Sequence, residues 1–225
     1  MKPKHIGIIP DGNRRWAKSK GIAEYLAHST PGNYHNLSKI FNTAMEEGVD
    51  TLSVWAFSTE NWRREKKEVD ELLGVIERSI DSFILAAPKD QYRFRVIGRR
   101  DNIPSRMEMK IRELEEETKN YTDIQIVVGL DYGGRDEIIR AINKAIKDGK
   151  QIDEEEFKKY LDTNDISDPD LIIRTGGEKR LSGYMPFQSI YSELIFLDIL
   201  FPDFTPNDLI NAIKEFEDRK RRFGS

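Results

Sequence analysis

Short apolar runs alternate with longer amphipathic stretches along the chain. The runs are rich in β-branched residues and almost continuously hydrophobic, which is typical of strands buried on both faces. They cover residues 6–9, 51–57, 94–97, 124–130, 171–173 and 194–197. The pattern predicts about six strands.

The stretches between these runs carry the 3.6-residue period of helices. Residues 69–87 place apolar side chains on one face and charged ones on the other, and the period recurs at 136–146. Ser105 and Glu108 have the spacing of a capping box. Because strands and helices alternate, we predict an α/β fold with a central, mainly parallel β-sheet covered by helices on its two faces.

Two further helices are predicted from breakers and caps. Residues 16–27 contain no breaker except Gly21, and they predict a helix after the first strand. Residues 205–208, Thr-Pro-Asn-Asp, open the last helix, and the basic residues 219–222 are expected at its C-terminus.

Composition narrows the class of protein. No linker or internal repeat divides the 225 residues, so we predict one domain over residues 1–225. A net charge of −4 gives no basic excess and argues against a nucleic-acid partner. The absence of cysteine excludes disulfides and thiolate chemistry and suits a cytoplasmic location. No apolar run approaches the ~20 residues that span a membrane, so we expect a soluble protein.

The first apolar run leads directly into a polar loop, Pro-Asp-Gly-Asn, and then into Arg14 and Arg15. A strand, a polar loop and a helix start form the usual place where α/β proteins bind anions. Asp11 would repel a phosphate there unless a divalent cation lies between them. Taken alone, the segment also fits a turn in which Asp11 caps the helix and the arginines are solvated.

Two more polar segments follow apolar runs, at residues 58–64 and 174–182, with Glu193 shortly beyond. Gathered at one sheet edge, they supply several arginines, small hydroxyls and few carboxylates, which suits two phosphate-bearing ligands and one divalent metal. Arg64 on a solvated face and Trp62 as a packing residue are the plainer alternatives. The chain lacks a P-loop motif and zinc-site spacing, and no hydrolytic triad can be placed.

These segments resemble the cis-prenyl diphosphate synthases, the undecaprenyl diphosphate synthase family, nearly end to end. The matching segments are HIGIIPDGNRRWAK (5–18), SVWAFSTENWRR (53–64), DYGGR (131–135), DLIIRTGGEKRLS (170–182), YSEL (191–194) and RRFG (221–224). The resemblance implies a homodimeric enzyme with a deep apolar tunnel for the growing prenyl chain. It also implies Mg²⁺ as cofactor, and a long product leaves room for peripheral contact with a membrane.

The resemblance assigns roles to residues at two substrate sites. Asp11 would hold Mg²⁺ against the allylic diphosphate, and Glu193 would be a second metal ligand. Residues of the first loop and a histidine would cradle that diphosphate: Gly12, Asn13, Arg14, Arg15 and His28. Isopentenyl diphosphate would lie against Arg174, Arg180, Leu181 and Ser182. The groups near the reacting carbons would be Ser58, Asn61 and Arg64, with Thr59, Glu60, Trp62 and Trp16 flanking the site. Arg222 and Gly224 would reach the active site of a partner subunit.

Departures from the family pattern keep two alternatives open. Glu24 stands where an arginine is usual, Ala27 and Pro31 replace glycines around the histidine, and Asp131 replaces an asparagine. Residues 183–187 depart from the usual second-site sequence, and a proline there resembles lavandulyl-type members, which couple two allylic diphosphates head to middle. We expect head-to-tail addition of isopentenyl diphosphate, with head-to-middle coupling to dimethylallyl diphosphate as the rival. A non-catalytic subunit is the third reading, although Asp11 and the second-site arginines are retained.

Overall fold

Six strands form one sheet, and each coincides with an apolar run of the sequence. The computed structural model describes residues 2–27 and 31–219, with the backbone alone described at 31–36 and 86–90. The strands are β1 (His5–Ile9), β2 (Thr51–Trp55), β3 (Tyr92–Ile97), β4 (Ile124–Gly129), β5 (Leu171–Arg174) and β6 (Glu193–Phe196). All neighbours pair in parallel, in the order β3-β4-β2-β1-β5-β6. The predicted parallel sheet is confirmed.

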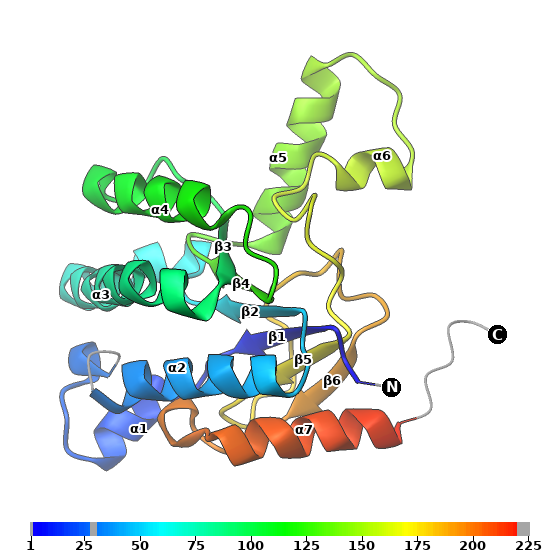
Figure 1. Cartoon of the computed structure of the whole chain (residues 1–225). Helices are drawn as coiled ribbons and strands as arrows, with labels where there is room; N and C mark the ends of the chain where they lie inside the picture. The colour runs from blue at the N-terminus through cyan, green and yellow to red at the C-terminus, as the bar shows by residue number, and fades with distance from the viewer. Residues whose placement is uncertain (1, 28–30, 220–225) are drawn as a thin grey trace.

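Helices connect the strands from β1 to β5, and turns and coil connect β5 to β6, as Figure 1 shows. The α-helices of the described residues are α1 (Asn13–Ser19), α2 (Pro31–Glu46), α3 (Lys66–Asp90), α4 (Ser105–Thr118), α5 (Gly134–Lys147), α6 (Glu154–Lys158) and α7 (Pro206–Asp218). Short 3-10 turns are η1 (Glu24–Leu26), η2 (Thr59–Arg63) and η3 (Phe201–Asp203). The helices predicted at 69–87 and 136–146 correspond to α3 and α5.

Helix ends differ from three of the predictions. The helix expected at 16–27 begins earlier, at Asn13, and ends at Ser19. Ser105 is the first residue of α4 and does not cap it, because Pro104 occupies the cap position and accepts the backbone N–H of Glu108. The last helix is opened by Thr205 as predicted but ends at Asp218, and Arg219 is extended, so Arg219 follows the helix; residues 220–222 lie outside the described residues.

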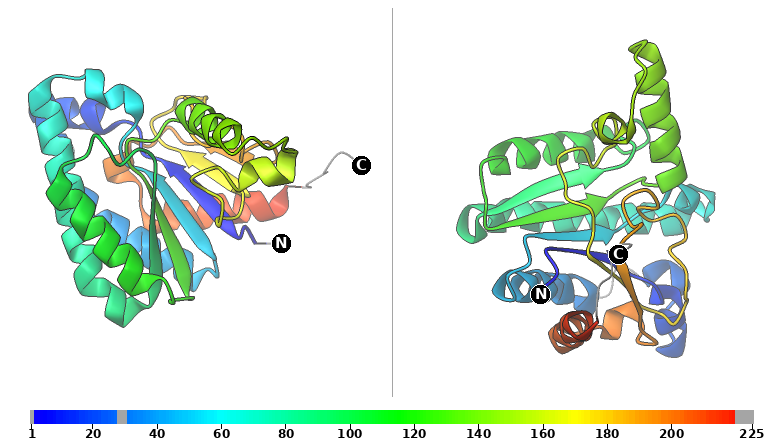
Figure 2. Two further views of the ribbon diagram at one scale, coloured as in Figure 1. Left: turned by 90° about the horizontal axis from the view of Figure 1, so that it is seen from above. Right: turned by 90° about the vertical axis from the view of Figure 1, so that its right-hand side faces the viewer.

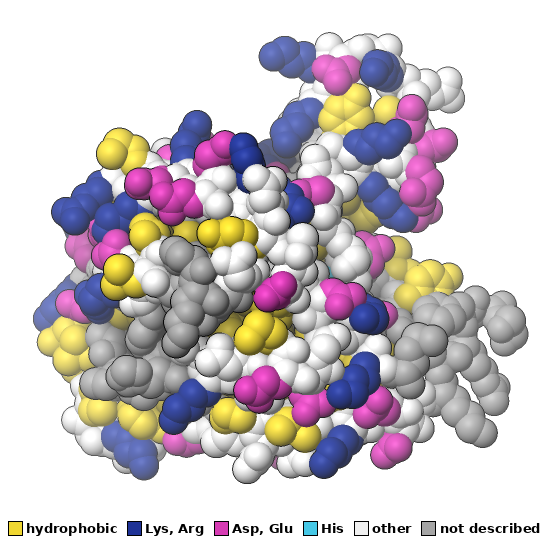
Figure 3. All heavy atoms as spheres, viewed as in Figure 1, with side chains coloured by type: hydrophobic (Ala, Val, Ile, Leu, Met, Phe, Trp, Pro, Cys, Tyr) yellow, Lys and Arg dark blue, Asp and Glu magenta, His cyan; other side chains and the backbone are white. Residues whose placement is uncertain are grey.

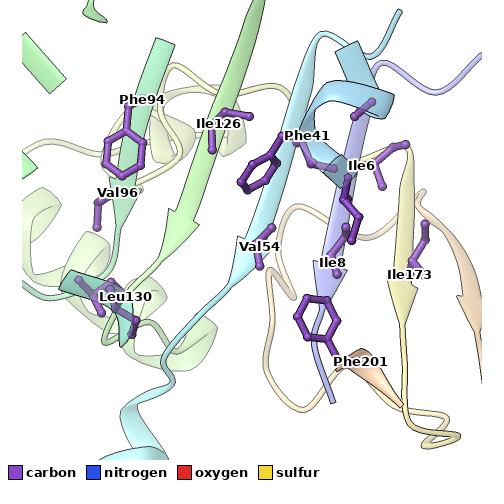
Figure 4. Packing of buried hydrophobic residues seen from close by; sticks show 14 of the residues in the cluster. Ile6, Ile8, Phe41, Val54, Phe94, Val96, Ile126, Leu130, Ile173 and Phe201 are labelled. Atoms are coloured by element: carbon purple, nitrogen blue, oxygen red, sulfur yellow. The ribbon is translucent and has the colours of Figure 1, made fainter. Parts of the chain in front are cut away.

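The main core lies on one face of the sheet. Side chains from α2, α3, α4 and α7 form one cluster with Ile6, Ile8 and Val54 from the central strands, and Figure 4 shows the aromatic ring of Phe41 between Ile126 and Val54. The other face is covered largely by the chain between α6 and β6, where Tyr184 packs in a second cluster. The sequence predicts helices on both faces of the sheet. In the structure helices cover one face, and coil covers much of the other.

Two features of the outer surface matter below. Helices α5 and α6 project away from the sheet in both views (Figures 1 and 2). Acidic and basic side chains are interspersed over the face in Figure 3. Within the described residues, no helix combines the length and the apolar composition needed to cross a membrane.

The sheet order places three polar segments side by side. β1 lies between β2 and β5, and all three run in the same direction. Their carboxyl ends lead into Asp11, Ser58 and the segment after Arg174. Ligands of open parallel sheets bind at this edge, where the strand order switches direction.

Candidate active site

Asp11 lies two residues beyond β1, in a turn fixed by neighbouring backbone. Its N–H donates to the Thr175 hydroxyl at 2.9 Å, and the same hydroxyl donates to the Asp11 carbonyl at 2.8 Å. Gly12 has φ +101°, and a Cβ there would lie 2.7 Å from a Leu200 methyl carbon. Only glycine fits this turn, because both the left-handed backbone and the close contact exclude a side chain.

Arg174 joins the first polar segment to the third. One terminal nitrogen donates to Asp11 Oδ2 at 2.8 Å, and the other donates to Ser182 Oγ at 2.8 Å and the Arg180 carbonyl at 2.6 Å. Its side chain is 6% exposed, and that of Asp11 is 29% exposed. A buried guanidinium thus holds the carboxylate and the hydroxyl on either side of it.

The second segment contributes an amide and a guanidinium. Asn61 Oδ1 accepts the backbone N–H of Ser58 at 2.9 Å, which closes the turn of η2. Arg64 donates to Glu68 at 2.8 Å, one helical turn further on. Glu68 is buried and lies 3.9 Å from Arg14 Nε, so one carboxylate faces two guanidinium groups.

Cations surround a hollow at the end of β1. It has a volume of about 480 Å³ and is lined by residues 10–15 together with Lys18, Glu24 and Arg64. Arg15 lies 3.4 Å from Asp11, and Arg14 is paired with Glu24 at 2.6 Å. We call this hollow the mouth. Its excess of cations suits a highly charged anion.

An apolar cavity of about 460 Å³ adjoins the mouth and also reaches Asp11 and Arg64. Its polar rim comes from the segments just described, and its walls come from α2, α3 and the sheet. The apolar lining includes Leu37, Phe41, Leu72, Val75, Ile76, Ile80, Phe83, Phe94, Val128 and Phe201. This cavity corresponds to the deep apolar tunnel expected from the sequence.

Two aromatic rings are shared by the tunnel and a smaller cavity. The ring centroids of Phe41 and Phe83 are 5.4 Å apart. Both rings line the tunnel and also a second cavity of about 50 Å³, whose lining includes Tyr92 and Ile124. The aromatic pair is therefore a common wall of both spaces.

Comparison with known proteins decides the family. The family model described as "Putative undecaprenyl diphosphate synthase" matches residues 9–224. The chain belongs to the undecaprenyl diphosphate synthase family. It is 45% identical to an isoprenyl transferase of Fusobacterium nucleatum, over 99% of this chain and 96% of that protein. It is 40% identical to a tritrans,polycis-undecaprenyl-diphosphate synthase (geranylgeranyl-diphosphate specific) of Pyrococcus abyssi, over 99% and 87% of the two chains.

A solved structure has the same fold over the whole chain. Lavandulyl diphosphate synthase from Lavandula x intermedia, crystallised with dimethylallyl diphosphate, superposes with a TM-score of 0.93 at 33% identity, over 100% of this chain and 99% of that one. The protein is therefore a prenyltransferase of isoprenoid biosynthesis, of the cis-prenyl diphosphate synthase type.

Several residues expected at the substrate sites lie on the cavity or the mouth. Asn13, Ser58, Glu60, Asn61 and Ser182 line the cavity, in addition to Asp11, Arg64 and Arg174. Gly12, Arg14 and Arg15 line the mouth. Their assignment as functional residues stays a prediction. His28, Arg222 and Gly224 lie outside the described residues.

Other expected site residues make structural contacts. The Trp62 indole N–H donates to Asp131 at 2.8 Å, and its ring packs on Phe57. The Trp16 N–H donates to Asp203 at 2.9 Å. Neither Trp16 nor Trp62 is one of the described residues that line the cavity or the mouth. Thr59 lies against the glycine pair before α5, and Leu181 packs in the second core cluster. Arg180 is exposed and pairs with Glu178 at 2.5 Å.

Glu193 does not join Asp11 within one chain. It is the first residue of β6 and is level with Leu171, which pairs with Ile6 at the beginning of β1. Five residues separate Ile6 from Asp11, roughly 16 Å at the rise of a strand. The Glu193 carboxylate instead accepts from Arg219 at 2.8 Å. Within one chain Asp11 and Glu193 lie at opposite ends of the sheet and cannot hold one metal together, so the role of Glu193 as a second metal ligand stays a prediction.

A buried polar contact lies on the sheet beneath the second-site segment. His5 Nδ1 lies 2.5 Å from the Ser167 carbonyl, which can only accept, so Nδ1 carries the proton and Nε2 accepts from the Ser53 hydroxyl at 2.7 Å. Burial lowers the pKa of His5 to about 4. Tyr184 stacks on Trp55, and burial raises the pKa of its hydroxyl. These contacts anchor the segment from the core side.

Glu68 is the residue at the site that sequence reasoning missed. Its spacing of four residues from Arg64 is the pattern of a helical ion pair, which was available in the sequence. Its proximity to Arg14 comes from the packing of α1 beside η1 and α3, which local spacing does not encode.

Proposed function

We propose that the protein condenses an allylic prenyl diphosphate with isopentenyl diphosphate, head to tail and in cis, and releases diphosphate. The observation that carries this proposal is the cationic mouth beside an apolar tunnel. A diphosphate suits the first and a hydrocarbon chain suits the second.

The mouth is proposed to bind the diphosphate of the allylic substrate. Arg14, Arg15 and Arg64 face this hollow, with the backbone of Gly12 and Asn13. When the allylic C–O bond breaks, its electron pair leaves with the diphosphate, and these cations stabilise the added charge. The double bond of isopentenyl diphosphate then attacks the allylic carbon, and loss of a proton restores a double bond.

Asp11 is the proposed ligand of a Mg²⁺ ion. Its carboxylate is part-exposed and lines both the cavity and the mouth. The described residues contain no cluster of three or more acidic, His or Cys side chains that could hold a metal. One carboxylate plus substrate phosphates is the coordination that Mg²⁺ commonly takes in proteins, so the residues fit. When bound, Mg²⁺ would supply charge neutralisation for the departing diphosphate.

The second substrate is proposed to bind beside Arg174. Arg174 and Ser182 line the cavity next to Asp11, and Arg180 lies exposed two residues before Ser182. The Asn61 oxygen already accepts a backbone N–H, and an amide is a poor base. We therefore assign proton removal to the diphosphate or to water, with Asn61 as a positioning residue.

Head-to-middle coupling with dimethylallyl diphosphate is the second candidate. It is favoured by the likeness to lavandulyl diphosphate synthase at a TM-score of 0.93 and by the unusual segment 183–187 that follows Ser182. Head-to-tail addition is favoured by the retained Arg174 and Ser182, because Arg174 donates to the Ser182 hydroxyl and also to the Asp11 carboxylate.

A homodimer in the cytoplasm is part of the proposal. Ile139 and Ile146 on the projecting helix α5 are 57% and 69% exposed, and Tyr191 is 63% exposed. Apolar side chains in this number are typical of a surface covered by a second copy. Glu193 and Arg222 would then act across the dimer, and a long product would bring the enzyme to a membrane surface.

Product analysis tests the proposal. Purified protein with Mg²⁺ is incubated with dimethylallyl, geranyl, farnesyl or geranylgeranyl diphosphate, each with and without isopentenyl diphosphate, and products are identified by mass spectrometry and NMR. Linear products that grow by C5 units only with isopentenyl diphosphate are expected. Branched products from allylic diphosphates alone would establish the second candidate. No product in any tube would overturn both and point to a subunit that needs a partner chain.

A further inference from the structure

Glu24 places a carboxylate inside a mouth that otherwise suits an anion. It lies in η1 and lines the hollow together with Asp11 and Arg14. Its Oε2 accepts from Arg14 Nη2 at 2.6 Å and from Nε at 2.9 Å. Both donors on one edge of the guanidinium are therefore directed at Glu24, in the geometry that a phosphate oxygen would also use.

The pair continues into a chain of alternating charges. Arg14 Nε is 3.9 Å from Glu68, and Glu68 accepts from Arg64 at 2.8 Å. The side chain of Glu68 is 9% exposed, whereas that of Glu24 is 45% exposed. Glu24 is thus the solvent-accessible acidic member, which can leave Arg14 at little desolvation cost, while Glu68 stays beside both arginines.

We propose that Glu24 competes with the diphosphate for Arg14 and so limits how tightly the mouth binds it. This inference rests on the proposed function of the mouth. In the empty mouth Glu24 pairs with Arg14, and an arriving diphosphate takes its place. The return of Glu24 to Arg14 favours release of the diphosphate product.

The size of the effect follows from the exposure of the pair. Exposed ion pairs change an equilibrium constant by at most about fivefold, and removing the carboxylate also removes its repulsion of the diphosphate. We therefore expect Glu24→Gln to tighten diphosphate binding about threefold to tenfold. The gain should shrink in high salt, because the charges are partly exposed.

Calorimetry with inorganic diphosphate tests this directly on the full-length protein with Mg²⁺. Wild type is compared with Glu24→Gln and with Glu116→Gln, which removes an equal charge from an exposed pair with Lys119 on α4. Tighter binding in Glu24→Gln and unchanged binding in Glu116→Gln are expected. In an Arg14→Gln background, Glu24→Gln should give a clearly smaller gain, because the contested guanidinium is absent and only the repulsion between Glu24 and the diphosphate is removed.

Kinetics provide a second readout. The KM for the allylic diphosphate should fall in Glu24→Gln, and the KM for isopentenyl diphosphate should stay constant. Equal or weaker diphosphate binding in Glu24→Gln, with binding lost in Arg14→Gln, would overturn the role of Glu24 and leave the mouth as a diphosphate site. If wild type and both single variants fail to bind diphosphate, the proposed function falls with it.

Discussion

Replacing Asp11 with asparagine removes one negative charge from the junction of the mouth and the tunnel and leaves the side-chain shape almost unchanged. Asp11 Oδ2 accepts from Arg174 at 2.8 Å, and Oδ1 accepts from the Gly12 N–H at 2.6 Å. Asparagine has one acceptor oxygen, so its NH₂ group must face one of these two donors. Two effects follow, one on stability and one on catalysis.

The cost in stability is set by the burial of Arg174. Removing one partner of a fully buried ion pair costs about 3–5 kcal/mol, and exposed pairs contribute about 0–1 kcal/mol. Arg174 is 6% exposed and Asp11 29% exposed. Arg174 also retains Ser182 and the Arg180 carbonyl as acceptors. We therefore expect a loss of about 2 kcal/mol, which lowers the Tm of a chain this long by about 4–8 °C.

The cost in turnover is expected to be larger. If Asp11 holds Mg²⁺ against the departing diphosphate, losing its charge should lower kcat by at least about 10²–10³, as for other groups that stabilise developing charge. Scanning calorimetry and a steady-state assay measure the two effects separately. Asp50→Asn is the control, since its pair with Lys4 is exposed on both sides, and it should change neither value.

Each outcome that departs from this pair of results refutes one step. Full turnover in Asp11→Asn would remove the metal role. An unchanged Tm would show that the Asp11–Arg174 contact adds no net stability despite the burial of Arg174.

Three further predictions concern the tunnel, the sheet and α5. Phe83→Ala should merge the tunnel with the 50 Å³ cavity beyond it and shift products to longer chains by mass spectrometry; unchanged lengths would show that the ring does not limit growth. The pKa of His5 is about 4 in the folded protein, below the 6.5 of a free histidine, so the unfolded chain binds the proton first. Stability in urea should therefore fall by about 3 kcal/mol from pH 7 to pH 4, and His5→Gln should flatten this fall. Ile146→Glu should dissociate the proposed dimer in analytical ultracentrifugation, whereas Met109→Glu, equally exposed on α4, should not.

The strands were predictable because a parallel sheet buries both faces of each strand. Helix α2 was not, since its first turn begins with Pro-Gly and its first half is polar, so the apolar period is incomplete. From this helix, Leu37 and Phe41 line the tunnel, whereas Ile40 and Ala44 are buried in the core beside the sheet. A wall made of two amphipathic helices and a sheet is a tertiary property, and no local pattern encodes it.

The polar edge was predictable for a similar reason, because every segment after a parallel strand lies at the same end. The rule places Asp11 and Ser58 at this edge. It does not apply to Glu193, which stands at the start of its strand, so the sheet carries it to the opposite edge. The apolar run at 194–197 already leaves Glu193 ahead of its strand, and the metal role expected for it came from the family resemblance alone.

The segment that departs most from the family pattern is anchored away from the reacting groups. Tyr184 stacks on Trp55 at 5.3 Å, and a Cβ at Gly7 would lie 3.1 Å from its ring. Pro186 occupies the space over Gly134, where a Cβ would lie 2.0 Å from the proline ring. Of residues 182–187, which are all described, only Ser182 lines the cavity. The segment therefore packs on the core side of the loop and leaves the Ser182 hydroxyl on Arg174, which is consistent with the proposed head-to-tail addition.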